Sequence, residues 1–410
     1  MSVGIEALNF YGGSAFIDIR TIFENRELNI SRFNNLMMYK KSVGVPCEDV
    51  VTNAVNAAKP IIDKLSESEK NKIELLITCS ESGIDFGKSI STYVHEYLGL
   101  SKNCRLFEIK QACYGGTAGL QMASCFIESQ ASKGAKALVI ASDVARAAVK
   151  YTYGEPSQAV GAAAMLISNK PDILELDFGA NGYYGYEVMD SCRPKPDIEL
   201  GESDLSLLSY LDCLEQCYIA YKEKVEGVDF RETFDYLVFH TPFPGMVKGA
   251  HRKMIREFSD LKSSEFDIDF NNRMEPSIRY CQQVGNVYSA SVYLALSSLI
   301  DNIEINSPKR IGIFSYGSGC SSEFYSGIIT ANSKRKLAVM KIEENLSNRY
   351  ELTIEEYDKL LDLNLEWIFG IKDKVMDMSA ASHIYDKFFK GKGLLVLKEI
   401  KDYHREYVWS

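Results

Sequence analysis

Three side chains that can support acyl transfer lie at the ends of predicted core elements. Cys113 comes directly before a glycine-rich turn that opens an apolar segment, CYGGTAGLQMASCF. At the start of a buried helix, unpaired N–H groups and the helix dipole would favour its thiolate, the nucleophilic form of cysteine. Gly115 and Gly116 permit close approach of another backbone. The alternative is a small cysteine that only packs in the core.

Glu81 and His240 end two other apolar runs, IELLITCS at 73–80 and FDYLVFH at 234–240. A carboxylate, an imidazole and a thiol at one site suit acyl transfer followed by proton removal next to a carbonyl. Taken singly, each of these residues has a plainer role as a cap or a surface residue. Their shared placement at strand ends predicts that they face one pocket.

Two further segments can contribute to such a site. SYGSG at 315–319 is a glycine-rich turn after an apolar run, and turns of this kind can direct backbone N–H groups at an oxyanion. The alternative is a tight turn that needs positive φ. Lys248, Arg252 and Lys253 follow His240 at near-helical spacing and form either a phosphate-binding cluster or a solvated helix face.

The elements that must position these residues alternate between strands and helices. Apolar runs at 73–80, 135–142, 234–240 and 310–316 predict central strands, and apolar segments at 113–134 and 283–302 predict buried helices. This order is typical of an α/β protein. The unit strand, helix, strand occurs twice, because 29 residues separate Cys113 from Ser142 and also Asn286 from Ser315.

The repeat predicts two duplicated halves, residues 1–170 with Glu81 and Cys113 and residues 171–410 with His240 and Asn286. Helices that are apolar on every face are buried between layers, so we expect five layers, αβαβα, with paired central helices between two sheets. Residues 181–230 predict an ordered lid or site wall. Residues 331–410 predict charged helices followed by a final strand, GLLVLKEI.

Composition restricts the classes of function. The 410 residues are 46% hydrophobic and carry a formal charge of −10, which disfavours broad binding of nucleic acids or anionic membranes. The N-terminus lacks the pattern of a secretory signal, and no apolar stretch is long enough to cross a bilayer, so we expect a cytoplasmic protein. Ten cysteines without CxxC pairs predict reduced thiols and no metal site.

From the N-terminus to about residue 330, the chain resembles the 3-hydroxy-3-methylglutaryl synthases of the thiolase superfamily. The resemblance rests on seven motifs in order: CSESGIDFGKS, EIKQACYGGTAGLQ, YGEPSQAVGAAAML, DSCRPKPD, FHTPFPGMVKGAHRK, VGNVYSAS and FSYGSG. It implies the five-layered thiolase-like fold and a condensing enzyme that forms carbon–carbon bonds.

The resemblance also implies a role for each site residue. Cys113 would be acetylated by a thioester donor, Glu81 would act as general acid and base at the acetyl group, and His240 would orient and polarise the acceptor. The remaining positions are Asn286 at the acceptor thioester or ketone, the amides of Cys113 and Ser318 with neighbouring Gly317 as oxyanion hole, and Asp143 and Asp190 behind the catalytic side chains.

Within the family, the chain is similar to the branch that serves polyketide β-branching, as in antibiotic biosynthesis. Ser191 and Cys192 replace two aromatics that are usual in the CoA-dependent enzymes, and Gln283 replaces an aromatic or basic residue. The segments GESDLSLLSYLDCLE and DYHREYVW also resemble this branch.

This branch implies a homodimer that uses two acyl carrier proteins, a donor carrying acetyl and an acceptor carrying a β-ketoacyl chain. Phosphopantetheine would arrive on these substrates, and no permanently bound cofactor is expected. The alternatives are the CoA-dependent synthase of the mevalonate pathway and a β-ketoacyl-carrier-protein synthase, which would lack the glutamate. A non-enzymatic scaffold would not need all three reactive side chains. The acceptor chain and the choice of acetyl or propionyl stay open.

Overall fold

The computed structural model describes residues 2–145, 149–152, 154–195, 198–364 and 369–410. Tyr153, Pro196 and Asp197, which belong to two of the motifs above, lie outside the described residues.

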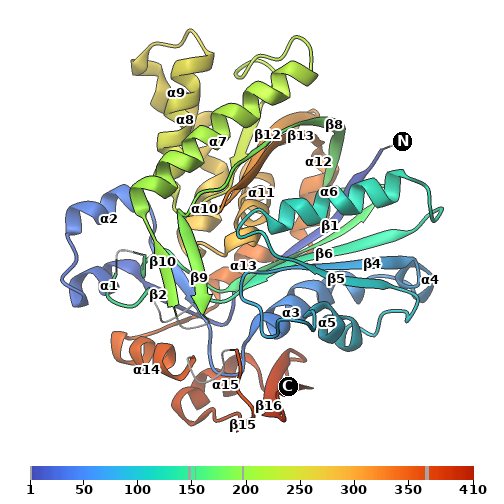
Figure 1. Ribbon diagram of the computed structural model, residues 1–410, viewed down its shortest axis with the longest axis vertical. Coiled ribbons are helices and arrows are strands. Elements are labelled where there is room, and N and C mark those ends of the chain that lie inside the picture. Colours follow the sequence, from blue (N-terminus) through green and yellow to red (C-terminus); the bar gives the residue numbers. More distant parts are fainter. Residues whose placement is uncertain (1, 146–148, 153, 196–197, 365–368) are drawn as a thin grey trace.

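A mixed nine-stranded sheet forms the centre of the molecule (Figure 1), in the order β11-β12-β13-β8-β1-β7-β6-β4-β5. The first half contributes β1 (Gly4–Tyr11), β4 (Ile73–Cys79), β5 (Arg105–Ile109), β6 (Lys136–Asp143) and β7 (Gly161–Ser168). The second contributes β8 (Leu174–Gly185), β11 (Tyr236–Phe239), β12 (Lys309–Gly317) and β13 (Ser321–Ile329). The four strands predicted from apolar runs are confirmed as β4, β6, β11 and β12.

The strands of the two halves join where β1 meets β8, a contact that the sequence does not predict. Gly4 pairs with Glu175 and Ile5 with Leu174, so hydrogen bonding continues from one half into the other. A side chain at Gly4 would place its Cβ 2.0 Å from the carbonyl oxygen of Leu174, so only glycine permits this approach. Two separate sheets were expected, and one continuous sheet is found. The division at residues 170 and 171 stays a prediction.

Side chains of β6 alternate between two helical layers, as the period of a strand requires. Val139 and Ala141 lie against α6 (Gly115–Glu128), beneath Gly119 and Gly116. On the opposite face, the Ser142 hydroxyl donates a hydrogen bond to the carbonyl of Val50, the first residue of α3 (Val50–Ile62), at 2.7 Å. The first half of the sheet is therefore covered on both faces.

The central layer contains α6 and α11 (Ser291–Asn302), which pack closely. The hydroxyls of Thr117 and Tyr293 lie 3.1 Å apart, and a Cβ at Gly116 would lie 2.9 Å from the carbonyl oxygen of Ser289. On the far side of β11–β13, α7 (Ser203–Lys224) and α8 (Pro244–Phe258) bury a second apolar cluster. The two parts of the continuous sheet lie on either side of the central helices, so the order α3, first part of the sheet, α6 with α11, second part of the sheet, α7 with α8 gives the predicted five layers.

The second central helix begins later than its apolar pattern predicts. α10 (Glu275–Val284) ends at Gly285, whose φ of +93° suits glycine alone, and a 3₁₀ turn at Tyr288–Ala290 precedes α11. Between them, the Asn286 side chain accepts hydrogen bonds from the backbone N–H of Tyr288 and the hydroxyl of Ser291. This local turn competes with helix formation, as asparagine side chains often do.

The described part of residues 181–230 continues from β8 into the paired strands β9 (Ser191–Lys195) and β10 (Ile198–Gly201), followed by α7. The predicted last strand is β16 (Leu395–Lys401), but it is not the final one, because β17 (His404–Trp409) pairs back onto it. The other C-terminal elements are β14 (Tyr350–Glu351), β15 (Lys374–Val375), α12 (Ala331–Ala338), α13 (Ile342–Ser347), α14 (Ile354–Asn364) and α15 (Ser382–Phe388).

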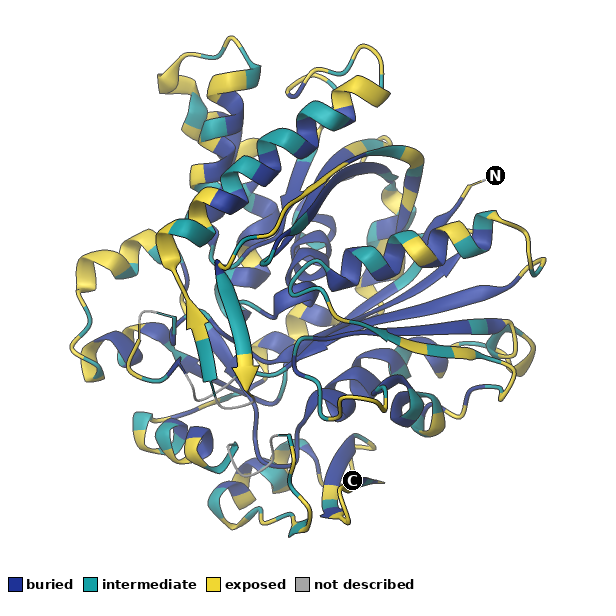
Figure 2. Cartoon of the chain, in the orientation of Figure 1, coloured by how far each residue is buried: buried dark blue, intermediate teal, exposed yellow. Residues whose placement is uncertain are grey.

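Smaller elements complete the fold around this frame. They are β2 (Ala15–Asp18), β3 (Lys40–Val43), α1 (Ile19–Asn25), α2 (Ile30–Leu36), α4 (Glu67–Lys70), α5 (Ser91–Tyr97) and α9 (Phe266–Arg273). Buried residues follow the sheet and its inner helices, whereas exposed residues gather on outer helices and hairpins (Figure 2). Among the described residues, no helix has the length and apolar character needed to span a membrane.

The tight contact of α6 with α11 predicts that Gly116→Ala is destabilising. The added methyl would lie within 3.0 Å of Ser289 and the Tyr293 ring, and overpacking of this kind costs about 1–3 kcal/mol. Gly249→Ala is the matched control, because this exposed glycine of α8 has no atom within 4 Å of its virtual Cβ. There, alanine should stabilise by about 0.5–1 kcal/mol. Thermal unfolding midpoints should separate the two variants, and equal midpoints would contradict this packing.

Candidate active site

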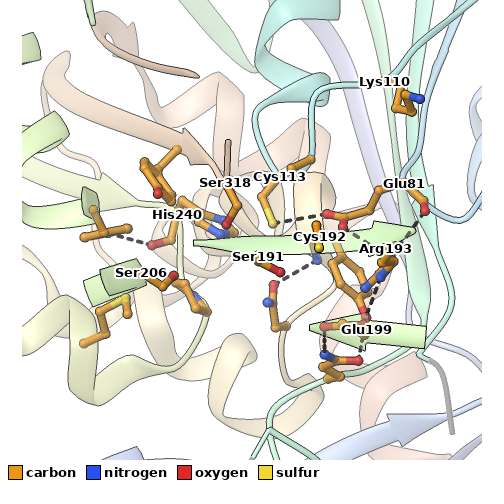
Figure 3. Close-up of a pocket in the computed structure, with 18 residues that line it drawn as sticks. Glu81, Lys110, Cys113, Ser191, Cys192, Arg193, Glu199, Ser206, His240 and Ser318 are labelled. Atoms are coloured by element: carbon orange, nitrogen blue, oxygen red, sulfur yellow. Dashed lines mark hydrogen bonds and ion pairs between the residues drawn. The ribbon is translucent and has the colours of Figure 1, made fainter. Parts of the chain in front are cut away.

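One cavity of about 380 Å³ collects Glu81, Cys113, His240, Asn286 and Ser318 from both halves of the chain (Figure 3). These residues follow β4, precede α6, follow β11, precede α11 and follow β12, respectively. The β9–β10 hairpin and the start of α7 form one wall, with Ser191, Cys192, Arg193, Glu199, Ser206 and Tyr210. Part of the segment 181–230 therefore forms a wall of the cavity, which is one of the two roles predicted for it.

The backbone around Cys113 is held in an unusual conformation. Ala112, directly before it, has a φ of +43°, which residues other than glycine rarely adopt. Gly317, at the end of β12, packs onto this loop so closely that a Cβ would lie 2.5 Å from the Tyr114 nitrogen and 2.6 Å from the Gln111 oxygen. Gly317 thus lets the turn that carries Ser318 lie next to Cys113, although it does not itself line the cavity.

The Cys113 thiol donates a hydrogen bond to Glu81 Oε1, with 3.4 Å between sulfur and oxygen. Burial raises the pKa of Cys113 well above its usual range, and the negative charges of Glu81 and Asp143 add to this effect. The resting residue is therefore a thiol next to a carboxylate that can accept its proton. The prediction of a resting thiolate is wrong, because burial and two nearby carboxylates outweigh the dipole of a helix that begins only at Gly115.

Asp143 fixes the backbone that carries Glu81. Its Oδ1 accepts hydrogen bonds from the Glu81 N–H at 2.9 Å, the Ser82 hydroxyl at 2.8 Å and the Ser80 hydroxyl at 3.1 Å. The carboxyl group is fully buried, and its Oδ2 has no hydrogen-bond partner among the described residues. Burial, followed by the charge of Glu81, raises the pKa of Asp143 to about 7. Asp143 therefore lies behind Glu81, as predicted for it.

His240 is 1% exposed, and burial lowers its pKa to about 3, so its imidazole is neutral near pH 7. Its backbone is held from both sides, since its N–H donates to Phe314 O at 2.7 Å and its carbonyl accepts from the Tyr210 hydroxyl at 2.8 Å. Nδ1 finds no partner within the described part of the chain. A neutral imidazole held this way can donate one hydrogen bond to a ligand without adding charge.

Asn286 presents one end of its amide to the cavity, because Oδ1 is already used by Tyr288 N at 2.9 Å and Ser291 Oγ at 3.0 Å. Its Nδ2 remains as a donor suited to a carbonyl oxygen. Asp190 holds the turn on the other side, where it accepts from the Tyr316 hydroxyl at 2.7 Å and the Gly319 N–H at 2.9 Å. Asp190 thereby fixes the turn that contains Ser318.

Arg193 is a charged residue of the site to which the sequence gave no role. Its Nη1 lies 3.2 Å from Glu81 Oε2, and its Nε lies 2.9 Å from Glu199 Oε2. Arg193 belongs to the DSCRPKPD motif, which marks the segment as characteristic of the family but does not show where this side chain lies. The fold of β9 against the cavity is needed to see that its side chain reaches Glu81.

The basic cluster after His240 does not line this cavity. On α8, Met246 faces the cavity, whereas Lys248 and Arg252 pair with Asp267 at 3.2 Å and 2.9 Å. Lys253 pairs with Glu215 and Glu257. Of the two alternatives for this cluster, the structure supports the helix face, because helical periodicity turns Lys248 and Arg252 toward α9. The lysine and arginine that line the cavity are Lys110 and Arg193.

The described residues contain no group of His, Cys, Asp and Glu side chains arranged to hold a metal ion. The reactive groups that line the cavity are the Cys113 and Cys192 thiols, the Glu81 and Glu199 carboxylates, the neutral His240 imidazole, the Arg193 guanidinium and the Lys110 amine. These groups suit transfer of an acyl group to sulfur and removal of a proton next to the acyl carbonyl.

The raised pKa of Cys113 predicts slow alkylation at neutral pH. At pH 8, iodoacetamide should modify Cys113 more slowly than Cys125, an exposed thiol on α6, because only the thiolate reacts. The Cys113 rate should keep rising up to pH 10, as followed by peptide mass spectrometry. Both thiols should react at similar rates in denaturant, which serves as the control. A Cys113 rate that levels off below pH 8 would show a resting thiolate and contradict this account.

Comparison with known proteins places this site in a family. The model of the hydroxymethylglutaryl-coenzyme A synthase N-terminal part matches residues 1–172, and that of the C-terminal part matches residues 195–269 and 263–408. The polyketide biosynthesis 3-hydroxy-3-methylglutaryl-ACP synthase PksG of Bacillus subtilis is 53% identical, over 100% of this chain and 99% of its own. The hydroxymethylglutaryl-CoA synthase of Enterococcus faecalis is 34% identical, over 89% and 93%.

Among solved structures, the HMG synthase of the curacin biosynthetic pathway, in complex with acetyl donor-ACP, superposes with a TM-score of 0.97. The two sequences are 55% identical, and the match covers 100% of both chains. The five layers described above are thus the thiolase-like fold of these synthases, and the expected fold class is confirmed. The chain belongs to the hydroxymethylglutaryl-coenzyme A synthase family.

Proposed function

We propose that this protein is a condensing enzyme of polyketide β-branching. It takes acetyl from a donor acyl carrier protein onto Cys113 and adds the acetyl methyl carbon to the β-ketone of a chain on an acceptor carrier protein. The observation that carries this proposal is the 3.4 Å contact of Cys113 with Glu81 in a cavity that also holds neutral His240. The PksG relative and the curacin synthase support the use of carrier proteins.

In the first step, the Cys113 sulfur attacks the acetyl thioester while its proton passes to Glu81. The tetrahedral oxyanion accepts hydrogen bonds from the backbone amides of Cys113 and Ser318. The Ser318 N–H makes no hydrogen bond to another described residue, so it is free for this role. The phosphopantetheine thiolate leaves and takes up the proton held by Glu81, which restores the carboxylate.

In the second step, Glu81 removes a proton from the methyl group of acetyl-Cys113, and the resulting enolate carbon attacks the β-ketone carbon. The ketone oxygen becomes an alkoxide, which His240 and the Asn286 amide stabilise as hydrogen-bond donors. The proton count closes when the alkoxide takes up the proton that Glu81 removed. A neutral His240 suits this role because it polarises the ketone without protonating the enolate.

In the third step, water hydrolyses the thioester that still joins the product to Cys113. The sulfur leaves as the thiol, and the acceptor keeps a 3-hydroxy-3-carboxymethyl branch. Phosphopantetheine enters and leaves on the carrier proteins, so the reaction needs no permanently bound cofactor.

The CoA-dependent synthase of the mevalonate pathway is the second candidate. Identity to PksG is 53%, against 34% for the Enterococcus CoA enzyme, which favours the carrier-dependent branch. A β-ketoacyl-carrier-protein synthase is a weaker candidate, because Glu81 occupies the site. We also propose that the protein is cytoplasmic and that it forms a homodimer. The exposed edge strand β5, with half-exposed Phe107, and exposed Met122 of α6 offer a surface for the dimer contact.

Substitutions should separate the acetylation of Cys113 from the condensation that follows it. Cys113→Ala should gain no acetyl mass from an acetyl-loaded donor. Glu81→Ala should still become acetylated, because loss of the carboxylate removes a negative charge that, after burial, raises the pKa of Cys113. Its condensation should fall about a hundredfold to ten-thousandfold. Intact mass spectrometry reads both steps, since acetyl-Cys113 should persist in Glu81→Ala after the acceptor is added.

His240→Ala should also accept acetyl but lose use of the acceptor. The assignment fails if Cys113→Ala carries acetyl, if Glu81→Ala turns over at the rate of the unsubstituted protein, or if His240→Ala uses the acceptor normally.

The acetyl donor that the enzyme prefers distinguishes the carrier-dependent branch of the family from the CoA-dependent one. At equal concentration, acetyl on a carrier protein should acetylate Cys113 at least about tenfold faster than acetyl-CoA, and the advantage should shrink with salt, as expected for an encounter between charged surfaces. Acetyl-pantetheine serves as the control for the arm without protein or nucleotide. Equal use of acetyl-CoA, together with efficient turnover of acetoacetyl-CoA, would instead assign the protein to the mevalonate pathway.

A further inference from the structure

The guanidinium of Arg193 lies between two carboxylates inside the cavity (Figure 3). Its Nη1 is 3.2 Å from Glu81 Oε2 and 3.3 Å from the Glu81 carbonyl oxygen, while its Nε is 2.9 Å from Glu199 Oε2. The Arg193 side chain is 13% exposed, as is that of Glu199. This is not a solvated surface pair, whose contribution is usually small.

A closed set of contacts holds this guanidinium in place. The other oxygen of Glu199 accepts a hydrogen bond from Gln158 Nε2 at 2.5 Å, and Gln158 Oε1 accepts one from the Tyr288 hydroxyl at 2.9 Å. The Tyr288 ring in turn lies 4.7 Å from Arg193 Cζ, a stacking distance for a guanidinium. Glu199, Gln158 and Tyr288 thus orient Arg193 from the side opposite Glu81.

Most of the other titratable groups near Glu81 are acidic or neutral. Asp143 of β6 holds the Glu81 backbone, Cys113 donates its thiol proton to Glu81, and neutral His240 at the end of β11 shares the cavity. The remaining titratable lining groups are Lys110, after β5, the Cys192 thiol of β9, and the Tyr210, Tyr288 and Tyr316 hydroxyls. Glu81 also borders a second cavity, whose other titratable groups are Asp85, Lys88, Glu108, Lys110, Arg193 and Lys195. Three carboxylates, those of Glu81, Asp143 and Glu199, therefore lie near one buried cation.

We propose that Arg193 is a positioning residue that keeps Glu81 ionised and directed at Cys113, and that Glu199 fixes Arg193 for this task. The inference rests on the proposed function, in which Glu81 must be a carboxylate to remove the acetyl proton. Without the guanidinium, a partly buried carboxylate beside Asp143 would hold its proton more tightly.

The arrangement requires arginine rather than lysine. Nη1 and Nε are fixed donors of one planar group, so they reach two carboxylates at once while the plane packs on Tyr288. A lysine ammonium is a single point on a flexible stem and cannot make both contacts in this geometry. Arg193→Lys should therefore restore only part of what Arg193→Gln removes.

Four variants test the proposal: Arg193→Gln, Arg193→Lys, Glu199→Gln, and Arg279→Gln as a control. Arg279 pairs with Glu275 on the exposed face of α10, outside the cavity. Each variant is first acetylated by the acetyl-loaded donor carrier protein. Single-turnover condensation with an acetoacetyl-loaded carrier protein is then followed from pH 5 to 9 by intact mass.

The acid limb of the condensation profile should move to higher pH by about one to three units in Arg193→Gln, and by less in Arg193→Lys. In Glu199→Gln it should also move to higher pH, but by less than in Arg193→Gln, because a neutral amide holds the guanidinium less firmly while its positive charge remains. Arg279→Gln should match the unsubstituted protein. If Arg193 has only a structural role, Arg193→Gln would lower the condensation rate equally at every pH and leave the acid limb in place. That result would overturn the proposal.

Iodoacetamide supplies a readout that does not depend on turnover. Arg193 lowers the pKa of the Cys113 thiol, against the larger effects of burial and Glu81, so Arg193→Gln should shift the alkylation profile of Cys113 to higher pH. If the unsubstituted protein accepts no acetyl, the proposed function fails. The pH profile of Cys113 alkylation would still show whether the charge of Arg193 acts on this cavity. An unshifted profile in Arg193→Gln would contradict the inference in either case.

Discussion

A thiol and a carboxylate that share one proton in a buried cavity impose the main constraint on this site. Cys113 and Glu81 are 3.4 Å apart, and two full negative charges at that distance would repel strongly away from bulk water. The proton of the pair must therefore pass between sulfur and oxygen as chemistry proceeds. The neighbouring residues serve this pair: Asp143 binds the Glu81 backbone, and Arg193 places a positive charge next to the Glu81 carboxylate. His240 adds no charge, since burial keeps it neutral.

The fold meets this constraint by bringing strand ends and helix starts of both halves to one place. Glu81 and His240 follow the ends of β4 and β11, while the loops before α6 and α11 carry Cys113 and Asn286. Close backbone contact makes this possible: Gly116 lets α6 approach the turn before α11, and Gly317 lets the end of β12 lie against the Cys113 loop. The side chains themselves are set by hydrogen bonds such as those of Asp143 and Asp190.

The sequence predicts the core strands and the meeting of Cys113, Glu81 and His240 because apolar periodicity and element order are properties of the chain itself. It does not predict charge states, which depend on neighbours from other strands. The resting state of Cys113 is an example, since its local helix dipole suggests a thiolate and its tertiary neighbours dictate a thiol. The sequence does not predict the role of Arg193 for the same reason, because the side chain reaches Glu81 only when β9 folds against the cavity. For Lys248 and Arg252 the sequence leaves two alternatives open, because spacing alone does not show which face of α8 they occupy.

The central claim is that Cys113 holds acetyl while Glu81 removes a proton from its methyl group, and the fate of the methyl hydrogens tests it most directly. A donor carrier protein loaded with trideuterated acetyl is mixed with the enzyme and an acetoacetyl-loaded acceptor, and the mass of the product on the acceptor carrier protein is measured by mass spectrometry. The account predicts a carboxymethyl branch with no more than two deuterium atoms, because one must leave to form the enolate. A product that keeps all three deuterium atoms would show transfer of an intact acetyl group and would contradict carbon–carbon bond formation in this cavity.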